Sequence, residues 1–262
     1  MRPGRRDFLR LLGATPIALV LNGCLGGSDD EVTVLADGSP VTGTPTAVVP
    51  TATAMPFTPT PPPSTLNRDD IVGLVMPVEG ACLPTSDRLM PNAPREYRNG
   101  IHEGVDFYFG DACVVIARGT PIVAAADGVV IRADHDYVEL TLAQVVELDA
   151  KTAQQGFSDP ETLDIYRGRQ VWIDHGNEIV TRYCHMESID EGVAVGIAVK
   201  AGQVIGGIGE SGTPESVTNP NTELHLHFEL RLGASFLGDG LPPEEVRALY
   251  ERAFTPKERA GT

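Results

Sequence analysis

The segment from Leu224 to Glu229 alternates apolar and polar residues without interruption. In a β-strand, alternate side chains share a face, so the three apolar residues of this segment would point into a core. His225, His227 and Glu229 would then line the opposite face, with the two imidazoles roughly 7 Å apart. The segment therefore predicts a strand that carries polar chemistry on one face, although a His-x-His pair taken alone is equally compatible with a solvent-facing pair.

Short β-type segments punctuated by glycine recur between residues 119 and 230. Besides the strand above, they are residues 119–125, 128–131, 170–174 and 178–183. Such segments, separated by glycine-rich turns, favour an all-β sandwich or barrel. We therefore expect an all-β domain with few helices.

Two segments depart from the β pattern. Residues 136–156 space several apolar side chains as a helix does and end on a glycine, so we expect a helix near residues 137–155. Alternating apolar residues at its start leave a strand open there. A second, short helix is expected from Pro242 to Phe254, because proline is favoured in the first turn of a helix.

Composition limits the function classes open to the chain. Its 262 residues carry 36 Asp and Glu against 20 Lys and Arg, a formal charge of −16. Nucleic-acid binding uses clustered Lys and Arg to replace phosphate counterions, so this balance argues against a nucleic-acid partner. Hydrophobic residues make up 42% of the chain, which excludes a wholly disordered protein. We expect a monomer.

The N-terminus has the organisation of an export signal. A pair of arginines precedes an apolar stretch from Leu11 to Leu21, which is too short to span a bilayer. The arginine pair resembles a twin-arginine signal, and the residues before Cys24 resemble a lipoprotein box. We therefore expect residues 1–23 to be a signal peptide that is removed, and Cys24 to be lipidated. A buried amphipathic helix is the alternative, but Pro16 interrupts it.

The expected lipid implies an anchored, extracytoplasmic protein. Acyl chains on Cys24 would hold the chain on the outer face of the cytoplasmic membrane, or in the periplasm or at the outer membrane of a cell with two membranes. Residues 24–66 are rich in Thr and Pro, which favours an extended, disordered tether. One compact domain over residues 67–241 follows, and residues 242–262 form a C-terminal helix and tail.

A second group of chemistry-bearing residues lies at His102 and Asp106. Their side chains offer a nitrogen and an oxygen ligand, both of which suit zinc. Gly104 between them lets the backbone bend so that both side chains converge. Alone, this pair is also a weak signal, because a surface histidine and aspartate four residues apart usually share no role.

The order of these motifs along the chain is more informative than either motif alone. The series comprises Gly100-x-His102-x-Gly104-x-Asp106, Gly119–Ala124, Asp174–Asn177, Thr181–Met186, Val199–Gly206 and His225-x-His227. Over about residues 98–232 it resembles the lysostaphin-type (LytM-like) zinc endopeptidases, metallopeptidase family twenty-three. The resemblance implies an antiparallel β-sandwich core of the lysostaphin (duplicated hybrid motif-like) type.

The resemblance also assigns roles to five residues. It implies that His102, Asp106 and His227 bind one zinc ion per chain, and that His185 and His225 are catalytic. Three protein ligands leave a fourth position open, as in catalytic rather than structural zinc sites. All five positions are filled in this sequence, which argues against a degenerate, inactive relative.

The activity that the resemblance implies is hydrolysis of peptide cross-links or stem peptides of peptidoglycan, for cell-wall remodelling. Export and anchoring agree with it, because that substrate lies outside the cytoplasmic membrane. One alternative is a non-catalytic wall-binding protein that activates another hydrolase. Another is a barrel-sandwich carrier module of the biotinyl or lipoyl kind, but neither Lys151 nor Lys200 has the exposed-hairpin setting that such a module requires.

The chain departs from the family pattern in two places. The link Phe107–Arg118 is longer than the usual short link, and an insertion of about residues 134–169 replaces a tight turn. Both segments could reshape the walls of the substrate groove. The resemblance therefore leaves the substrate preference open.

Other candidate residues have simpler interpretations. Glu229 is more simply a solvated or salt-bridged carboxylate than a group that orients a metal ligand. We interpret His175 as a turn residue and His135 as a surface residue. Trp172 is interpreted as core.

Four cysteines are present, of which Cys24 is expected to carry lipid. Export permits disulfides, and we expect Cys82 to pair with Cys113, because both lie in segments that flank His102. Cys184 then remains a small buried residue beside His185.

Overall fold

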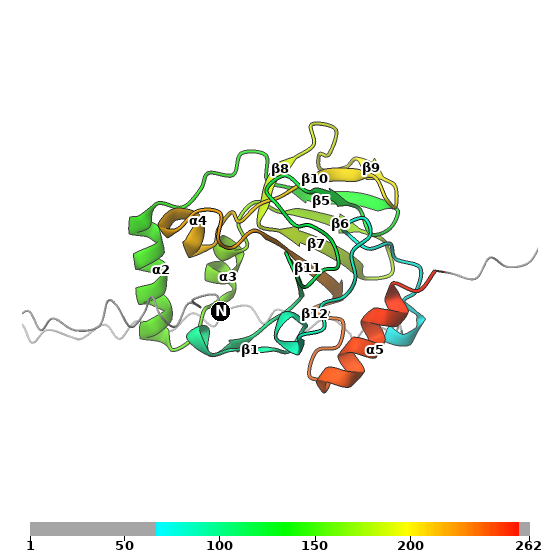
Figure 1. The fold of residues 1–262 in the computed structure, drawn as a ribbon, viewed down its shortest axis with the longest axis horizontal. Coiled ribbons are helices and arrows are strands. Elements are labelled where there is room, and N and C mark those ends of the chain that lie inside the picture. Colours follow the sequence, from blue (N-terminus) through cyan, green and yellow to red (C-terminus); the bar gives the residue numbers. More distant parts are fainter. Residues whose placement is uncertain (1–66, 257–262) are drawn as a thin grey trace, which may run out of the picture. The chain divides into compact units, whose positions relative to one another are not determined.

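The structure is a computed structural model that describes residues 67–256 (Figure 1). The expected signal peptide over residues 1–23, the lipidation site Cys24 and the tether over residues 24–66 lie outside the described residues. Within the part of the chain that the structure describes, no helix has the length and apolar character needed to cross a membrane.

Seven strands form the largest of the three antiparallel sheets in the described residues. Its order is β12-β11-β7-β6-β5-β9, and β3 also pairs with β11. Every pair in this sheet is antiparallel. The strands are β3 (Val105–Tyr108), β5 (Gly128–Ala133), β6 (Val171–Asp174), β7 (Ile179–Cys184), β9 (Ala198–Val199), β11 (His225–Leu232) and β12 (Ser235–Phe236).

The second sheet has three strands in the order β4-β10-β8. The remaining strands are β4 (Pro121–Val123), β8 (Met186–Ile189), β10 (Val204–Ile208) and, in a two-stranded ribbon, β1 (Pro94–Arg95) and β2 (Gly100–Ile101). Ile122 and Ile205 of the smaller sheet pack in one core with Ile173 and Phe228 of the larger sheet. The antiparallel, all-β class expected from the sequence is confirmed.

Strand β11 has the alternation that its sequence predicted. Three of its side chains are fully buried in the core: Leu226, Phe228 and Leu230. His225, His227 and Glu229 lie on the opposite face, and they are buried as well. The two histidines are therefore not a solvent-facing pair.

The insertion between β5 and β6 is helical, as Figure 1 shows. Its first helix, α2 (Leu142–Gln155), begins later than the expected helix over residues 137–155. A capping box fixes this start, because the side chain of Thr141 accepts the N–H of Gln144 and the side chain of Gln144 accepts the N–H of Thr141. The helix ends as expected at Gly156, which has a left-handed backbone conformation.

The other described helices are short. They are α3 (Pro160–Tyr166), α4 (Pro214–Thr218), α5 (Pro243–Ala253) and the single 3-10 turns η1 (Arg68–Asp70), η2 (Asp87–Leu89) and η3 (Glu96–Arg98). The expected C-terminal helix corresponds to α5, which buries Val246 and Tyr250 in the core. No helix was expected at α3 or α4, although each begins with a capping residue followed by proline, as Asp159 does before α3.

The longer link between β3 and β4 is tied down by a disulfide. Cys113 of this link pairs with Cys82, which is the pairing expected from the sequence. The N–H of Cys82 also donates to the carbonyl oxygen of Ala112 at 3.0 Å. Cys184 is a free, fully buried cysteine.

Candidate metal centre and active site

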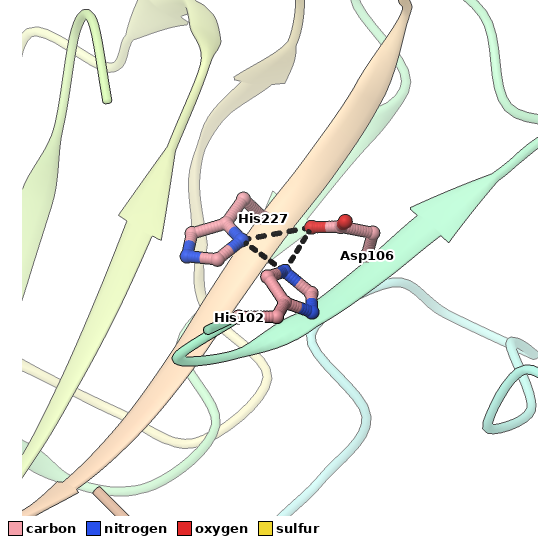
Figure 2. Close-up of side chains that lie close together, drawn as sticks. All are labelled: His102, Asp106 and His227. Atoms are coloured by element: carbon pink, nitrogen blue, oxygen red, sulfur yellow. Dashed lines mark hydrogen bonds and ion pairs between the residues drawn. The ribbon is translucent and has the colours of Figure 1, made fainter. Parts of the chain in front are cut away.

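Three side chains converge at one buried point (Figure 2). His102 Nε2 lies 2.9 Å from Asp106 Oδ1 and 3.0 Å from His227 Nδ1. His227 Nδ1 lies 2.8 Å from Asp106 Oδ1. Two imidazole nitrogens and one carboxylate oxygen are a donor set that suits zinc, whose tetrahedral ligand atoms lie about 3.4 Å apart at bond lengths of about 2.1 Å. A divalent cation fits this donor set.

The pairing of β3 with β11 brings two of these residues together. Asp106 lies directly opposite His227 in the register. His102 reaches the same point from the chain before β3, which passes close to β11 at Gly104. A Cβ at Gly104 would collide with the carbonyl oxygen of Phe228, so glycine is required for this approach.

Each imidazole of the cluster has its outer nitrogen held by an acceptor. His102 Nδ1 donates to the carbonyl oxygen of Met90 at 3.1 Å, and His227 Nε2 donates to Glu229 Oε1 at 3.1 Å. In a neutral ring whose proton lies on this outer nitrogen, His102 Nε2 and His227 Nδ1 present lone pairs to the point of convergence. Both rings are therefore oriented as neutral metal ligands would be.

Burial and mutual contact shift the titration of the cluster. Burial lowers the pKa of His102 to about 4, so its ring is neutral at pH 7. Burial also acts to lower the pKa of His227, but hydrogen bonds to Asp106 and Glu229 outweigh it and raise that pKa. For Asp106, burial acts to raise the pKa, yet His102 and His227 hold it well below its usual range. The carboxylate is therefore ionised.

Two more histidines border the cluster. The ring centroids of His185 and His225 lie 4.6 Å apart, and those of His185 and His227 lie 5.9 Å apart. His225 Nδ1 donates to the carbonyl oxygen of Glu223 at 2.6 Å, and His185 Nδ1 donates to that of Ser211 at 2.8 Å. Each ring therefore keeps its proton on Nδ1 and leaves the lone pair of Nε2 available.

Both of these rings are neutral near pH 7. Burial lowers the pKa of His225. Burial, together with the neighbouring His225 and His227, lowers the pKa of His185 well below its usual range. His225 Nε2 lies 3.9 Å from Asp106 Oδ1, next to the point of convergence. Neutral imidazoles in this position can accept protons from water or substrate held there.

His185 lies where the chain passes from one sheet to the other. Strand β7 ends one residue before it, and β8 begins one residue after it. Its φ of +60° lies in the left-handed region, which costs a non-glycine residue about 1–3 kcal/mol. Its N–H donates to the carbonyl oxygen of Arg167 at 2.9 Å, and its own carbonyl accepts the N–H of Gly209 at 3.0 Å. The surrounding backbone thus holds a strained residue in place.

Glu229 orients His227 and is not solvated. Its Oε1 accepts from His227 Nε2 and, at 2.6 Å, from Arg167 Nε. Its Oε2 accepts from Arg182 and Arg231, each at 3.2 Å. Burial acts to raise its pKa, but Arg167, His227 and Arg231 hold that pKa below its usual range. The interpretation as a solvated carboxylate is wrong, and salt bridges occur together with the contact to His227.

The remaining sequence candidates lie outside the cluster. Both ring nitrogens of His175 bond oxygens of other segments, and His135 is exposed, as expected for a turn residue and a surface residue. Trp172 is half-buried rather than core. It lies opposite Arg182 on the polar face of β6, with the guanidinium 3.8 Å from its ring centroid, while its neighbour Ile173 faces the core.

Arg95 and Arg167 also belong to the site, although no sequence pattern predicted them. Arg95 Nη2 contacts Asp106 Oδ2 at 3.1 Å and so holds the oxygen that the histidines do not contact. Arg167 contacts Glu229. Their partners lie 11 and 62 positions away along the chain, so neither arginine has a local sequence signal.

Comparison with known proteins places the chain in a family. The family model described as Peptidase family M23 matches residues 100–237, which is slightly more than half of the chain. The chain belongs to this family. The matched span contains all five histidine and aspartate positions singled out above, and the resemblance seen in the sequence is confirmed at the level of the family.

The similar proteins include cell-wall and zinc peptidases. Over 160 residues, 60% of this chain, the sequence is 30% identical to the peptidoglycan DD-endopeptidase ShyC of Vibrio cholerae serotype O1. The chain spans only 25% of that relative's length. A putative peptidase M23 from Pseudomonas aeruginosa superposes with a TM-score of 0.38 at 24% identity, covering 70% of this chain and 52% of that one. A zinc-containing peptidase from Vibrio cholerae superposes with a TM-score of 0.38 at 24% identity. This match covers 67% of this chain and 40% of that one.

The close approach at Gly104 predicts the effect of adding one carbon atom. Gly104→Ala should destabilise the protein by about 1–3 kcal/mol, because the new methyl group must push the chain before β3 away from β11. Chemical denaturation measures the change. Gly192→Ala is the matched control, since a Cβ there meets nothing within 4 Å. Equal stability of the two variants would contradict the role of Gly104.

Proposed function

We propose that the protein is a zinc-dependent endopeptidase that hydrolyses peptide cross-links or stem peptides of peptidoglycan. One observation carries the proposal: two imidazole lone pairs and an ionised carboxylate oxygen meet at a buried point that two further neutral imidazoles border. Membership of peptidase family M23 supports the activity. Similarity to a peptidoglycan DD-endopeptidase supports the substrate class.

In this proposal, three atoms hold one zinc ion per chain: His102 Nε2, Asp106 Oδ1 and His227 Nδ1. Zinc at that position supplies Lewis acidity, which activates water and polarises a carbonyl oxygen. Hydrogen bonds within the chain orient these ligands. The Met90 carbonyl and the Glu229 carboxylate hold the outer ring nitrogens, so His102 Nε2 and His227 Nδ1 would face the ion.

His185 and His225 handle the protons of the reaction. Both rings have Nδ1–H fixed on a backbone carbonyl and Nε2 unprotonated. One ring accepts the proton of the attacking water. The other, once protonated, stabilises the developing oxyanion or donates a proton to the leaving amine. Their ring separation of 4.6 Å allows both to serve one substrate.

The proposal includes an extracytoplasmic location. The expected export signal, the expected lipid on Cys24 and the Thr- and Pro-rich segment after it would bring a monomeric domain to the cell wall while it stays anchored to the membrane. Peptidoglycan lies outside the cytoplasmic membrane, so this location and the proposed substrate support each other.

Substitutions should separate metal binding from proton transfer. His102→Ala should lose zinc and activity together, because it removes a ligand. His225→Ala should keep most of its zinc yet lose about 10²–10⁴-fold in kcat, because only proton transfer is removed. Zinc content is measured by elemental mass spectrometry, and turnover by mass spectrometry of muropeptides with and without chelator.

Two outcomes would contradict these assignments. Full zinc occupancy in an inactive His102→Ala protein would remove His102 from the ligand set. Normal turnover by His225→Ala would remove His225 from catalysis. A wild-type protein that binds wall material but releases no peptide fragments would support the non-catalytic alternative instead.

Zinc affinity should fall as the pH decreases. The ligand-free pKa of His227 is raised above its ordinary 6.5, whereas that of His102 is lowered to about 4. One proton, on His227, therefore competes with zinc between pH 5 and 8. Affinity should drop about tenfold per pH unit below the pKa of His227 and level off above it. Competition with a fluorescent chelator measures this slope, and a hundredfold drop per unit would mean that His102 is also protonated.

The anchor is tested separately from the chemistry. Cys24→Ser should release the protein from membranes in cell fractionation and abolish incorporation of radiolabelled lipid. The zinc content of the purified variant should match that of the wild type. A variant that still carries labelled lipid would show that Cys24 is not the acylated residue.

A further inference from the structure

The helical insertion reaches the candidate metal centre through Arg167, the residue that follows α3. The side chain of Arg167 is largely buried and bridges two carboxylates: its Nε lies 2.6 Å from Glu229 Oε1, and its Nη2 lies 2.9 Å from Glu103 Oε2. Glu229 belongs to β11, and Glu103 precedes β3. The insertion is therefore bonded to both segments that supply the convergent side chains.

Arg167 and His227 share one oxygen atom. Glu229 Oε1 accepts from both, whereas the two sheet arginines, Arg182 and Arg231, contact Oε2. Without Arg167, the carboxylate would be drawn only from its other side, and it could turn away from His227 Nε2. The ring of His227 would then lose the group that keeps its Nδ1 lone pair aimed at the centre.

The backbone of the same residue supports His185. The carbonyl oxygen of Arg167 accepts the His185 N–H at 2.9 Å. The next residue, Gly168, has a φ of +66°, and a Cβ there would collide with the carbonyl of Ser211. That carbonyl accepts the Nδ1 proton of His185. The end of the insertion thus packs against the loop that orients the ring of His185.

The beginning of the insertion contacts the same loop. Glu139, which precedes α2, accepts the N–H of Gly212 through Oε1 at 3.0 Å. Both ends of the insertion therefore contact the segment at residues 211–212. Because these contacts reach the histidines through intermediates, the role that they imply is positioning and not direct participation.

We propose that Arg167 is a positioning residue that holds the metal ligand His227 and the proton-transfer residue His185 in their positions relative to each other. The insertion is then an integral part of the active centre. This inference rests on the proposed function. It follows that the segment at residues 134–169 does more than shape the walls of a substrate groove. Metal affinity in the absence of substrate should depend on a side chain that touches no metal ligand.

The test compares Arg167→Gln with Arg132→Gln in the full chain. Arg132 is the matched control, because it also bonds the insertion, through Asp164 at 2.7 Å, but its other ion pair is with Asp134 and not with the site. Arg167→Gln should weaken zinc binding by about 10–100-fold and lower kcat with little change in KM. Arg132→Gln should bind zinc as the wild type does, even where its melting temperature falls equally. Zinc affinity is measured by chelator competition without substrate.

Further variants keep the inference falsifiable. If Arg167→Gln does not fold, Arg167→Lys should bind zinc with intermediate affinity, because an ammonium keeps the charge but cannot bridge both carboxylates. In the background of Glu229→Gln, adding Arg167→Gln should weaken zinc binding by less than threefold, because the shared oxygen is already altered.

The outcomes separate this inference from the proposed function. Wild-type zinc affinity in Arg167→Gln, or equal losses in the Arg167 and Arg132 variants, would overturn the positioning role while the zinc peptidase assignment stands. A wild-type protein that binds no zinc would overturn the proposed function, and this inference with it.

Discussion

The antiparallel pairing of β3 with β11 is the constraint on which the rest of the site depends. It sets Asp106 opposite His227, and it sets Tyr108 opposite His225, where the two rings stack with centroids 4.2 Å apart. A shift of one residue in this register would turn both histidines of β11 into the core and leave Leu226 facing the aspartate. The glycine at position 104 is part of the same constraint, since it lets the chain before β3 pass against β11.

Burial gives these polar groups their chemical character. Each histidine at the site has one ring nitrogen fixed on an acceptor, and burial lowers the pKa of three of the four: His102, His185 and His225. A buried, ionised Glu229 would be costly alone, but three arginines surround it. The positive charges of the arginines thus lie next to the carboxylate that orients His227, and neutral imidazoles border the point of convergence. The arrangement favours a metal cation at the point where the lone pairs meet.

The sequence correctly predicted the features that depend on neighbouring residues. Alternation identified β11 and its two faces, proline at its start identified α5, and the ordered motifs named the residues that the structure brings together. It failed where a local pattern was ambiguous. The apolar residues before Thr141 suggested an earlier start for α2, and Trp172 was assigned to the core because a five-residue strand does not reveal which face is buried. Contacts between distant segments, such as Arg95 with Asp106, leave no such pattern.

The five candidate residues lie on or next to paired strands, apart from the inserted segments. They come from three separate stretches of chain that meet on paired strands, and His185 lies at the corner where the chain changes sheets. Strands packed on a common core fix such positions more rigidly than loops do. The long link after β3 and the insertion after β5 lie outside these paired strands. The contact between Arg167 and Glu229 connects the insertion to them, so any change in the insertion that moves Arg167 also acts on the carboxylate behind His227.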